Sequence, residues 1–288
     1  MSRPLRNSLP VPALPLLLFA VAGVARAADP DPREIVRRSV DAAQGQNEKL
    51  ARQYTFLERV EAQQFDARGN VKSSSLKTYD VTVLEGSPYR RLVERDDRPL
   101  SPVEERREQE SLRSSIEKRR KETEPERAKR LAEYEKERAK YRKAIREIPD
   151  AFQFRLRGEE PVDGRPAYVI DATPLPGYQP KDRYARLFRQ LRGSLWIDKA
   201  DFHWRRADAE LIDTFSLGWI LVRIARGAHV TIDLTRVNGE VWLPQRIGFS
   251  ASARIGLFKT MNVRQVMTYR SYKKFQTDSR ILSTSNEW

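Results

Sequence analysis

Residues 230–243, VTIDLTRVNGEVWL, carry the strongest hairpin signal in the chain. The apolar residues of 230–234 alternate with polar ones, as in a strand with one buried face. Asn238-Gly239 follows, which is a dipeptide preferred in two-residue hairpin turns, and residues 241–243 resume the apolar pattern. Two neighbouring antiparallel strands are therefore predicted here.

The same alternation extends through most of the chain in both directions. Alternating segments lie near residues 54–60, 79–94, 152–157, 166–173, 194–206, 247–251 and 260–272. Short turns separate them, so consecutive strands are expected to pair antiparallel. A sheet of about ten strands with one apolar face must curl and be covered. The sequence thus predicts an α+β fold, in which helices cover a curled antiparallel half-barrel sheet and a charged helical segment is inserted.

Three predicted helix starts share a capping side chain, an early proline and a glutamate at the third helical position. The first opens a helix over about residues 32–50, and the other two open a helical segment over roughly 102–147. That segment lies in an insertion, residues 101–149, where 28 of 49 residues are charged. Its second half has a thin apolar seam, which predicts light packing on another element or projection into solvent. The seam consists of Leu131, Tyr134, Tyr141, Ile145 and Ile148. A short helix is also expected over residues 184–191.

Residues 1–27 have the features of a secretory signal peptide. Arg3 and Arg6 form a basic start, an apolar stretch follows, and Ala25-Arg26-Ala27 is a small-x-small cleavage site. We therefore expect a periplasmic protein with one domain over residues 28–288. An uncleaved N-terminal anchor is the alternative, although the apolar stretch is shorter than the roughly 20 residues a spanning helix needs.

The amino-acid composition excludes several classes of protein and of functional site. The 288 residues have 39% hydrophobic content, enough for a core, so wholesale disorder is excluded. The absence of cysteine excludes disulfides, thiolate metal sites and cysteine nucleophiles, and two histidines leave little room for a metal centre. The formal net charge of +14 could suggest nucleic acid, but export and the acids interleaved in the same helices argue against it.

Three segments resemble the outer-membrane lipoprotein-sorting proteins, the LolA/LolB-like family. They are GSLWID at residues 193–198, VNGEVWLP at 237–244 and YRSYKKF at 269–275. The resemblance implies a half-open barrel whose apolar cavity holds acyl chains or a lipoprotein anchor. For such a carrier we expect binding by apolar burial, with no enzymatic chemistry and no cofactor. Related sensor proteins bind a partner's periplasmic segment on a similar fold. The charged insertion is foreign to the family.

No catalytic or metal-binding constellation is predicted. His203 and His229 fall in different strands, and each is expected to decorate a sheet face. Asp198 and Asp201 flank a tight turn, where short acidic side chains usually make local hydrogen bonds. A metal site or a catalytic pair at these two residues is the weaker interpretation, which would make the protein an envelope hydrolase.

Large apolar residues supply the candidate ligand wall. If the sheet is a half-barrel, its inward residues line the cavity, whereas simple core packing is the alternative for most of them. The residues predicted to bind ligand are Trp196, Trp204, Phe215, Trp219, Leu221, Ile224, Trp242 and Phe249. The apolar run 215–227 is either a short buried helix or strand, a lid, or a loop that contacts a bilayer.

Two functions from different classes are consistent with these features. The first is a periplasmic carrier that shields acyl chains of a lipid or lipoprotein in an apolar cavity. The second is a regulatory or assembly adaptor that binds a protein partner through residues 101–149. For that segment a solvated helix face is the default, and docking on an anionic membrane surface or an acidic partner is a further option.

Overall fold

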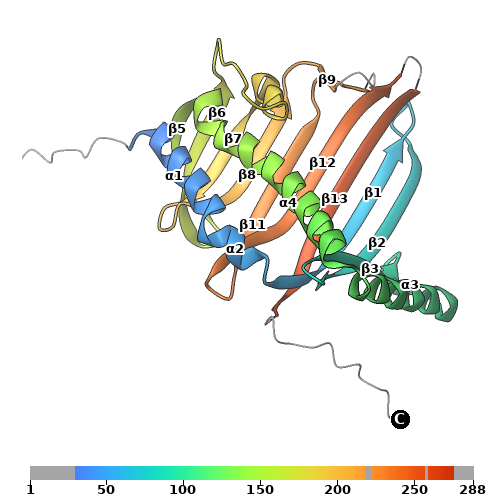
Figure 1. Ribbon diagram of the computed structural model, residues 1–288. Coiled ribbons are helices and arrows are strands. Elements are labelled where there is room, and N and C mark those ends of the chain that lie inside the picture. Colours follow the sequence, from blue (N-terminus) through green and yellow to red (C-terminus); the bar gives the residue numbers. More distant parts are fainter. Residues whose placement is uncertain (1–29, 218–221, 257–258, 276–288) are drawn as a thin grey trace, which may run out of the picture. The chain divides into compact units, whose positions relative to one another are not determined.

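The computed structural model describes residues 30–217, 222–256 and 259–275 (Figure 1). Their strands form one antiparallel sheet whose order is β4-β3-β2-β1-β13-β12-β11-β8-β7-β6-β5, with β9 and β10 beside β12. The bounds are β1 (Tyr54–Phe65), β2 (Val71–Leu84), β3 (Ser87–Arg95), β4 (Arg98–Pro99), β5 (Phe152–Val162), β6 (Arg165–Pro174), β7 (Leu191–Asp198), β8 (Trp204–Leu211), β9 (Phe215–Leu217), β10 (Val222–Ile224), β11 (His229–Val237), β12 (Val241–Ile255) and β13 (Lys259–Lys274).

The α+β fold with a large, open antiparallel sheet is confirmed. The sheet has 13 strands rather than about ten, because β4, β9 and β10 are only two or three residues long and give no alternation to detect. The hairpin predicted at Asn238-Gly239 joins β11 to β12, with φ of 50° and 70° at its two turn residues. Both angles lie in the left-handed region that this turn requires.

The N-terminal helix covers one half of the sheet. α1 (Pro32–Gln44) begins at Asp31, whose side chain accepts a hydrogen bond from the Arg33 N–H. The helix predicted to reach residue 50 is broken at Gly45, and α2 (Gln46–Ala51) continues beyond it. The main core therefore lies between α1 and the strands β5 to β8. It contains Ile35, Val36, Val40, Ile148, Ile170 and Ile197.

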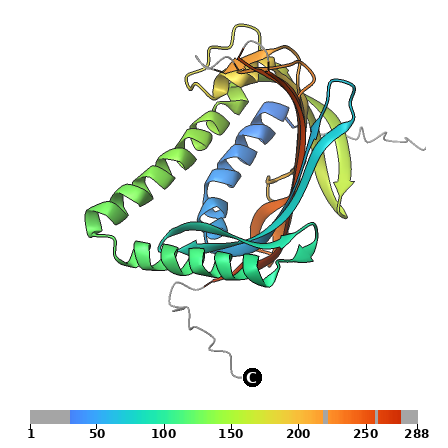
Figure 2. The ribbon, with the colours of Figure 1, turned by 90° about the vertical axis from the view of Figure 1, so that its right-hand side faces the viewer.

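The insertion forms two long helices, which match the predicted helical segment. α3 (Pro102–Arg120) starts with a complete capping box between Ser101 and Glu104 and packs on β3. α4 (Glu124–Arg146) runs from the far end of α3 back to α5 (Ile148–Ala151) beside α1 (Figure 2).

Both ends of α4 are held by the body of the protein. Near its start, Arg130 donates to Ser87 Oγ (2.8 Å), and Arg119 at the end of α3 donates to the carbonyl oxygens of Leu84 (2.5 Å) and Ser87 (3.1 Å). At its end, Ile145 packs on the main core. The sequence left two arrangements open for the insertion, packing on another element or projection into solvent. The structure shows packing on another element.

A second apolar cluster lies where β9 and β10 meet the sheet. Phe215 and Ile224 pack on buried Leu211, Ala228 and Ala251, together with the 3-10 helix η1 (Ala185–Gln190). The run 215–227 is thus a short hairpin on β12 in its described part and not a helix. The predicted signal peptide and residues 218–221 lie outside the described residues. Within them, no helix is long and apolar enough to cross a membrane.

Candidate apolar binding cavity

A cavity of about 740 Å³ lies between α4 and the strands β1 to β3. Its volume falls in the range of small-molecule sites, which are typically about 300 to 1,000 Å³. Most of its wall is apolar, and its charged groups come from α2, α4, β1 and β3. A mainly apolar wall with a few charged groups suits a ligand that has a long apolar part and a polar end.

The sheet side of the cavity is aromatic and aliphatic. Phe56 of β1 packs edge-on against Tyr269 of β13, with 5.7 Å between ring centroids, and Val81 of β2 lies beside them. Burial and the neighbouring Glu58 carboxylate raise the pKa of Tyr269 to about 12, so its hydroxyl stays neutral at physiological pH. The cavity wall thus gains no charge from this ring.

The opposite side comes from the insertion. Leu131 and Tyr134 of α4 line the cavity, and Leu131 lies against Gly86 in the turn between β2 and β3. A Cβ at Gly86 would lie 3.1 Å from a Leu131 methyl carbon, and φ there is 83°, so glycine permits both the turn and the close approach. The apolar seam seen in the sequence therefore divides. Its N-terminal part lines the cavity, Tyr141 is 61% exposed, and its C-terminal part enters the core.

A cluster of ion pairs ties α4 to α2 at the margin of the cavity. Glu48 of α2 accepts hydrogen bonds from Arg138 (2.9 Å) and Arg142 (2.7 Å) of α4, while Arg52 pairs with Glu135 at 3.0 Å. Burial raises the pKa of Glu48, but hydrogen bonds from three guanidinium groups outweigh it and hold that pKa below its ordinary value. Glu48 is therefore a charged anchor between the two helices.

Of the eight residues predicted to bind ligand, the six that the structure describes do not line this cavity. Trp204 donates from Nε1 to Ser39 Oγ (2.8 Å) and packs on the main core. Phe215 and Ile224 belong to the second apolar cluster, and Phe249 is 37% exposed.

Trp196 and Trp242 lie in surroundings of charged groups. Trp196 lies on the face of the sheet away from α1, because Leu195 and Ile197 on either side of it pack on the core under α1. Its ring contacts Arg157 and Arg206, and Trp242 is buried beside the guanidinium groups of Arg165 and Arg205. The two remaining predicted residues, Trp219 and Leu221, lie outside the described residues.

The residues that do line the cavity gave weaker sequence signals. Leu131 and Tyr134 stood out as part of a helical seam, and Tyr269 belongs to the terminal segment that resembles the family. Phe56 and Val81 had only the alternation of ordinary strand residues. A pattern that marks burial does not tell which buried face borders an open space.

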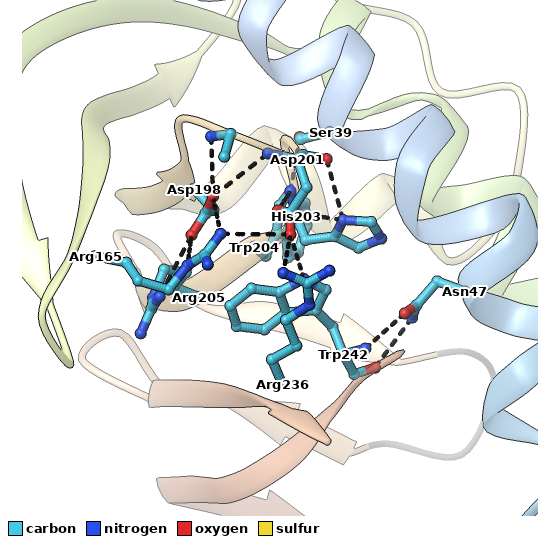
Figure 3. A network of polar contacts seen from close by, with 11 residues as sticks. Ser39, Asn47, Arg165, Asp198, Asp201, His203, Trp204, Arg205, Arg236 and Trp242 are labelled. Carbon is cyan, nitrogen blue, oxygen red and sulfur yellow. Dashed lines mark hydrogen bonds and ion pairs between the residues drawn. The ribbon is translucent and has the colours of Figure 1, made fainter. Parts of the chain in front are cut away.

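The acidic residues of the GSLWID segment and the turn after it form a structural cluster (Figure 3). Asp198 is 1% exposed and accepts two hydrogen bonds from Arg165, at 2.7 and 2.9 Å, and one from Arg205 at 3.3 Å. Burial raises the pKa of Asp198, but the bonds from Arg165 and the Ala200 N–H outweigh it and lower the pKa to about 2. Such a carboxylate is stably ionised and fully used as an acceptor.

Asp201 and His203 extend this cluster towards α2. Asp201 accepts from the indole N–H of Trp242 at 3.0 Å, His203 stacks on the Trp242 ring, and Asn47 makes two hydrogen bonds with the Trp242 backbone. The predicted local hydrogen bonds of the turn are confirmed, since the Ala200 and Asp201 N–H groups donate to Asp198. The cluster thus joins three hairpins and α2.

The two histidines are not brought together. His229 lies on β11, and its Nε2 is 2.8 Å from Asp208 of β8, in a half-exposed pair. In the part of the chain that the structure describes, no group of three or more histidine, aspartate or glutamate side chains is arranged to hold a metal ion.

Several solved structures of other proteins match this chain at low sequence identity. No family model and no curated protein matches the chain. A LolA superfamily protein from Nitrosomonas europaea is 11% identical, with 86% of this chain and 95% of that chain covered and a TM-score of 0.34. An outer membrane lipoprotein-sorting domain from Vibrio parahaemolyticus is 10% identical, with 85% and 95% covered and a TM-score of 0.34. A MucA/MucB complex from Pseudomonas aeruginosa matches at 12% identity, with 85% and 99% covered and a TM-score of 0.25.

The family that the sequence resembles is thus named among the matched structures. TM-scores this low do not indicate which ligand or partner this chain binds. Its own contacts have to decide that.

Proposed function

We propose that this chain is a periplasmic carrier without enzymatic activity, which shields the apolar part of a lipid or acylated ligand in the cavity under α4. The observation that supports it is the apolar wall shared by β1 to β3 and α4, in a cavity of about 740 Å³. Transfer of an acyl chain from water into such a wall is favourable by about 25 cal/mol per Å² of apolar surface. The charged groups that line the cavity are available to the polar part of the ligand.

The proposal is tested by uptake of a fluorescent fatty acid, cis-parinaric acid, by the chain over residues 28–288. We expect saturable binding of about one molecule per protein, because the cavity is of single-ligand size. Native mass spectrometry of protein purified from a periplasm should then show an acylated molecule bound. No uptake of the probe together with a clean apo mass would contradict the proposal.

Two variants of α4 make the test specific. Leu131→Glu places a charge in the apolar wall and should weaken binding at least about ten-fold, because an ion is costly to desolvate there. Ala132→Glu adds the same charge one residue further on, where the side chain is exposed, and should bind as the parent does. A third variant, Leu131→Trp, fills the cavity without charge and should also weaken binding. Equal binding by all three would place the ligand elsewhere.

The adaptor hypothesis needs a different test from simple removal of the insertion. Because Leu131 and Tyr134 belong to the cavity wall and Ile145 to the core, deletion of residues 101–149 would damage a carrier and an adaptor alike. Substitutions confined to exposed residues of α3 separate the two, since they leave the cavity intact.

A further inference from the structure

Helix α3 sorts its charged residues by sign. Residues 101–121 contain seven basic and five acidic side chains. Three of the acids face β3, where Glu104 accepts from Arg95 (3.1 Å), Glu105 lies 3.6 Å from Arg91, and Glu108 accepts from the Leu92 N–H (3.3 Å). These three acids of α3 therefore hold the helix on the arginines and backbone of β3.

The opposite face of α3 is left basic. Its exposed acids are Glu110 and Glu117, and its exposed cations are Arg106, Arg107, Arg113, Lys118, Arg120 and Lys121. Among the described residues, the ion pair recorded on this face joins Glu117 to Lys121 at 4.0 Å. The other five cations have no ion-pair partner there, so their charge is directed outwards.

These cations form a row along the helix. Arg106, Arg113 and Arg120 are seven residues apart, which places them about 10 Å apart on nearly one line. Val103, which is 51% exposed, lies on the same face in the first turn. α4 differs in net charge, because four exposed glutamates balance its four exposed cations. The glutamates are Glu124, Glu126, Glu133 and Glu137, and the cations are Lys129, Lys136, Lys143 and Arg146.

We propose that this basic face of α3 docks the protein on the surface of a bilayer that contains anionic lipid. Protein–protein interfaces are enriched in aromatic residues at their centre, and α3 contains no aromatic residue. A spaced row of long cationic side chains suits the diffuse negative potential of lipid headgroups, which acts within a Debye length.

The docking surface lies next to the cavity. Arg119 at the end of α3 and Arg130 of α4 donate hydrogen bonds to Leu84 and Ser87, which flank the turn between β2 and β3. Gly86 of that turn lines the cavity. Docking through α3 would bring this end of the cavity towards the bilayer, where an apolar ligand is exchanged. This step rests on the proposed carrier function, whereas docking itself does not.

The test is flotation of the chain over residues 28–288 with vesicles of phosphatidylcholine, with and without phosphatidylglycerol. We expect binding only with phosphatidylglycerol, and a steep decrease of binding as salt is added. The triple variant R106Q/R113Q/R120Q should lower the vesicle affinity about ten-fold or more, because each cation near the surface contributes. Failure of the parent protein to float with anionic vesicles would overturn the proposal.

The matched control is K129Q/K136Q/K143Q, which removes three charges at the same spacing from α4. It should float as the parent does. An equal loss of vesicle binding in both variants would mean that net charge, and not the basic face of α3, sets the binding, and it would overturn the proposal. Binding of polyglutamate that depends on α3, without vesicle binding, would indicate an acidic protein partner instead. Uptake of cis-parinaric acid without vesicles is measured for each variant, so failure of the carrier function is distinguished from failure of docking.

Discussion

At the scale of single residues, Asp198 is the least exposed charged side chain in the described structure. Its carboxylate is buried with Arg205, which is 3% exposed, and it also holds Arg165 of the neighbouring hairpin. A buried pair of this kind adds little over apolar packing, but removal of one partner leaves an uncompensated charge. The cluster should therefore be sensitive to substitution without being catalytic.

Asp198→Asn is expected to lower the free energy of unfolding by about 3 to 5 kcal/mol at pH 7, because Arg205 loses its buried partner and keeps its pair with the exposed Asp163, while Arg165 loses its two-bond partner. Urea denaturation followed by circular dichroism measures this change. Asp233→Asn, which removes a more open pair with Arg206, should cost about 1 kcal/mol or less. Equal losses in the two variants would contradict the role assigned to Asp198.

The pH dependence of stability has a definite sign here. The pKa of Asp198 in the folded protein, about 2, lies below the ordinary value of 3.8. Its stabilisation is thus fully present above about pH 5 and is lost as the pH falls towards 2, by an amount near 2 kcal/mol. Urea midpoints between pH 7 and pH 2 should fall more steeply for the parent than for Asp198→Asn. Parallel curves would show that another group governs acid unfolding.

The turn at Asp198 was predictable, but its partners were not. The spacing of Asp198 and Asp201 indicates local hydrogen bonds, which the structure has. Arg165 comes from a different hairpin, and nothing in the local sequence pairs it with this turn. The face of the sheet on which a tryptophan lies is equally hard to predict. A register shift after Trp196 pairs Trp204 with Ile197, so Trp196 and Trp204 lie on opposite faces of the sheet.

At the scale of elements, α4 spans the cavity between two fixed ends. Its middle is held to α2 chiefly by Glu48, whose side chain is 17% exposed and meets Arg138 and Arg142. The two capping boxes at Ser101 and Thr123 make the starts of α3 and α4 readable from sequence. The surface that α4 faces cannot be predicted in the same way, because an apolar seam of Leu131 and Tyr134 could pack on any apolar surface.

Glu48→Gln should loosen the middle of α4 without unfolding the protein. The substitution replaces the carboxylate shared by the two α4 arginines with a neutral amide, at a cost of about 1 to 3 kcal/mol. Hydrogen exchange should become faster over residues 131–143 and stay unchanged in α3. Glu133→Gln, at an exposed position of the same helix, is the control and should change neither. Faster exchange in both variants would mean that helix charge, and not the anchor, sets the protection of α4.

At the scale of the whole molecule, the cavity joins parts that are far apart in sequence. β1 pairs with β13, so the start and the end of the domain lie side by side in the sheet, and α4 from the insertion faces them. Alternation and turn residues were enough to predict a curled antiparallel sheet. The position of the cavity depends instead on where the charged insertion returns to the core, and the composition of the insertion does not determine this.

A ligand in this cavity must contact α4 and the sheet together, so it should stabilise the whole fold. At about 100 times the dissociation constant, a ligand that binds only the native state adds about 2.7 kcal/mol. In a domain of this size each kcal/mol raises Tm by about 2 to 4 °C, which predicts an increase of about 5 to 10 °C. Calorimetry with saturating palmitate measures it, and Leu131→Glu should lose the increase while Ala132→Glu keeps it. An unchanged Tm in the parent, or an increase retained by Leu131→Glu, would mean that acyl chains do not enter between α4 and the sheet.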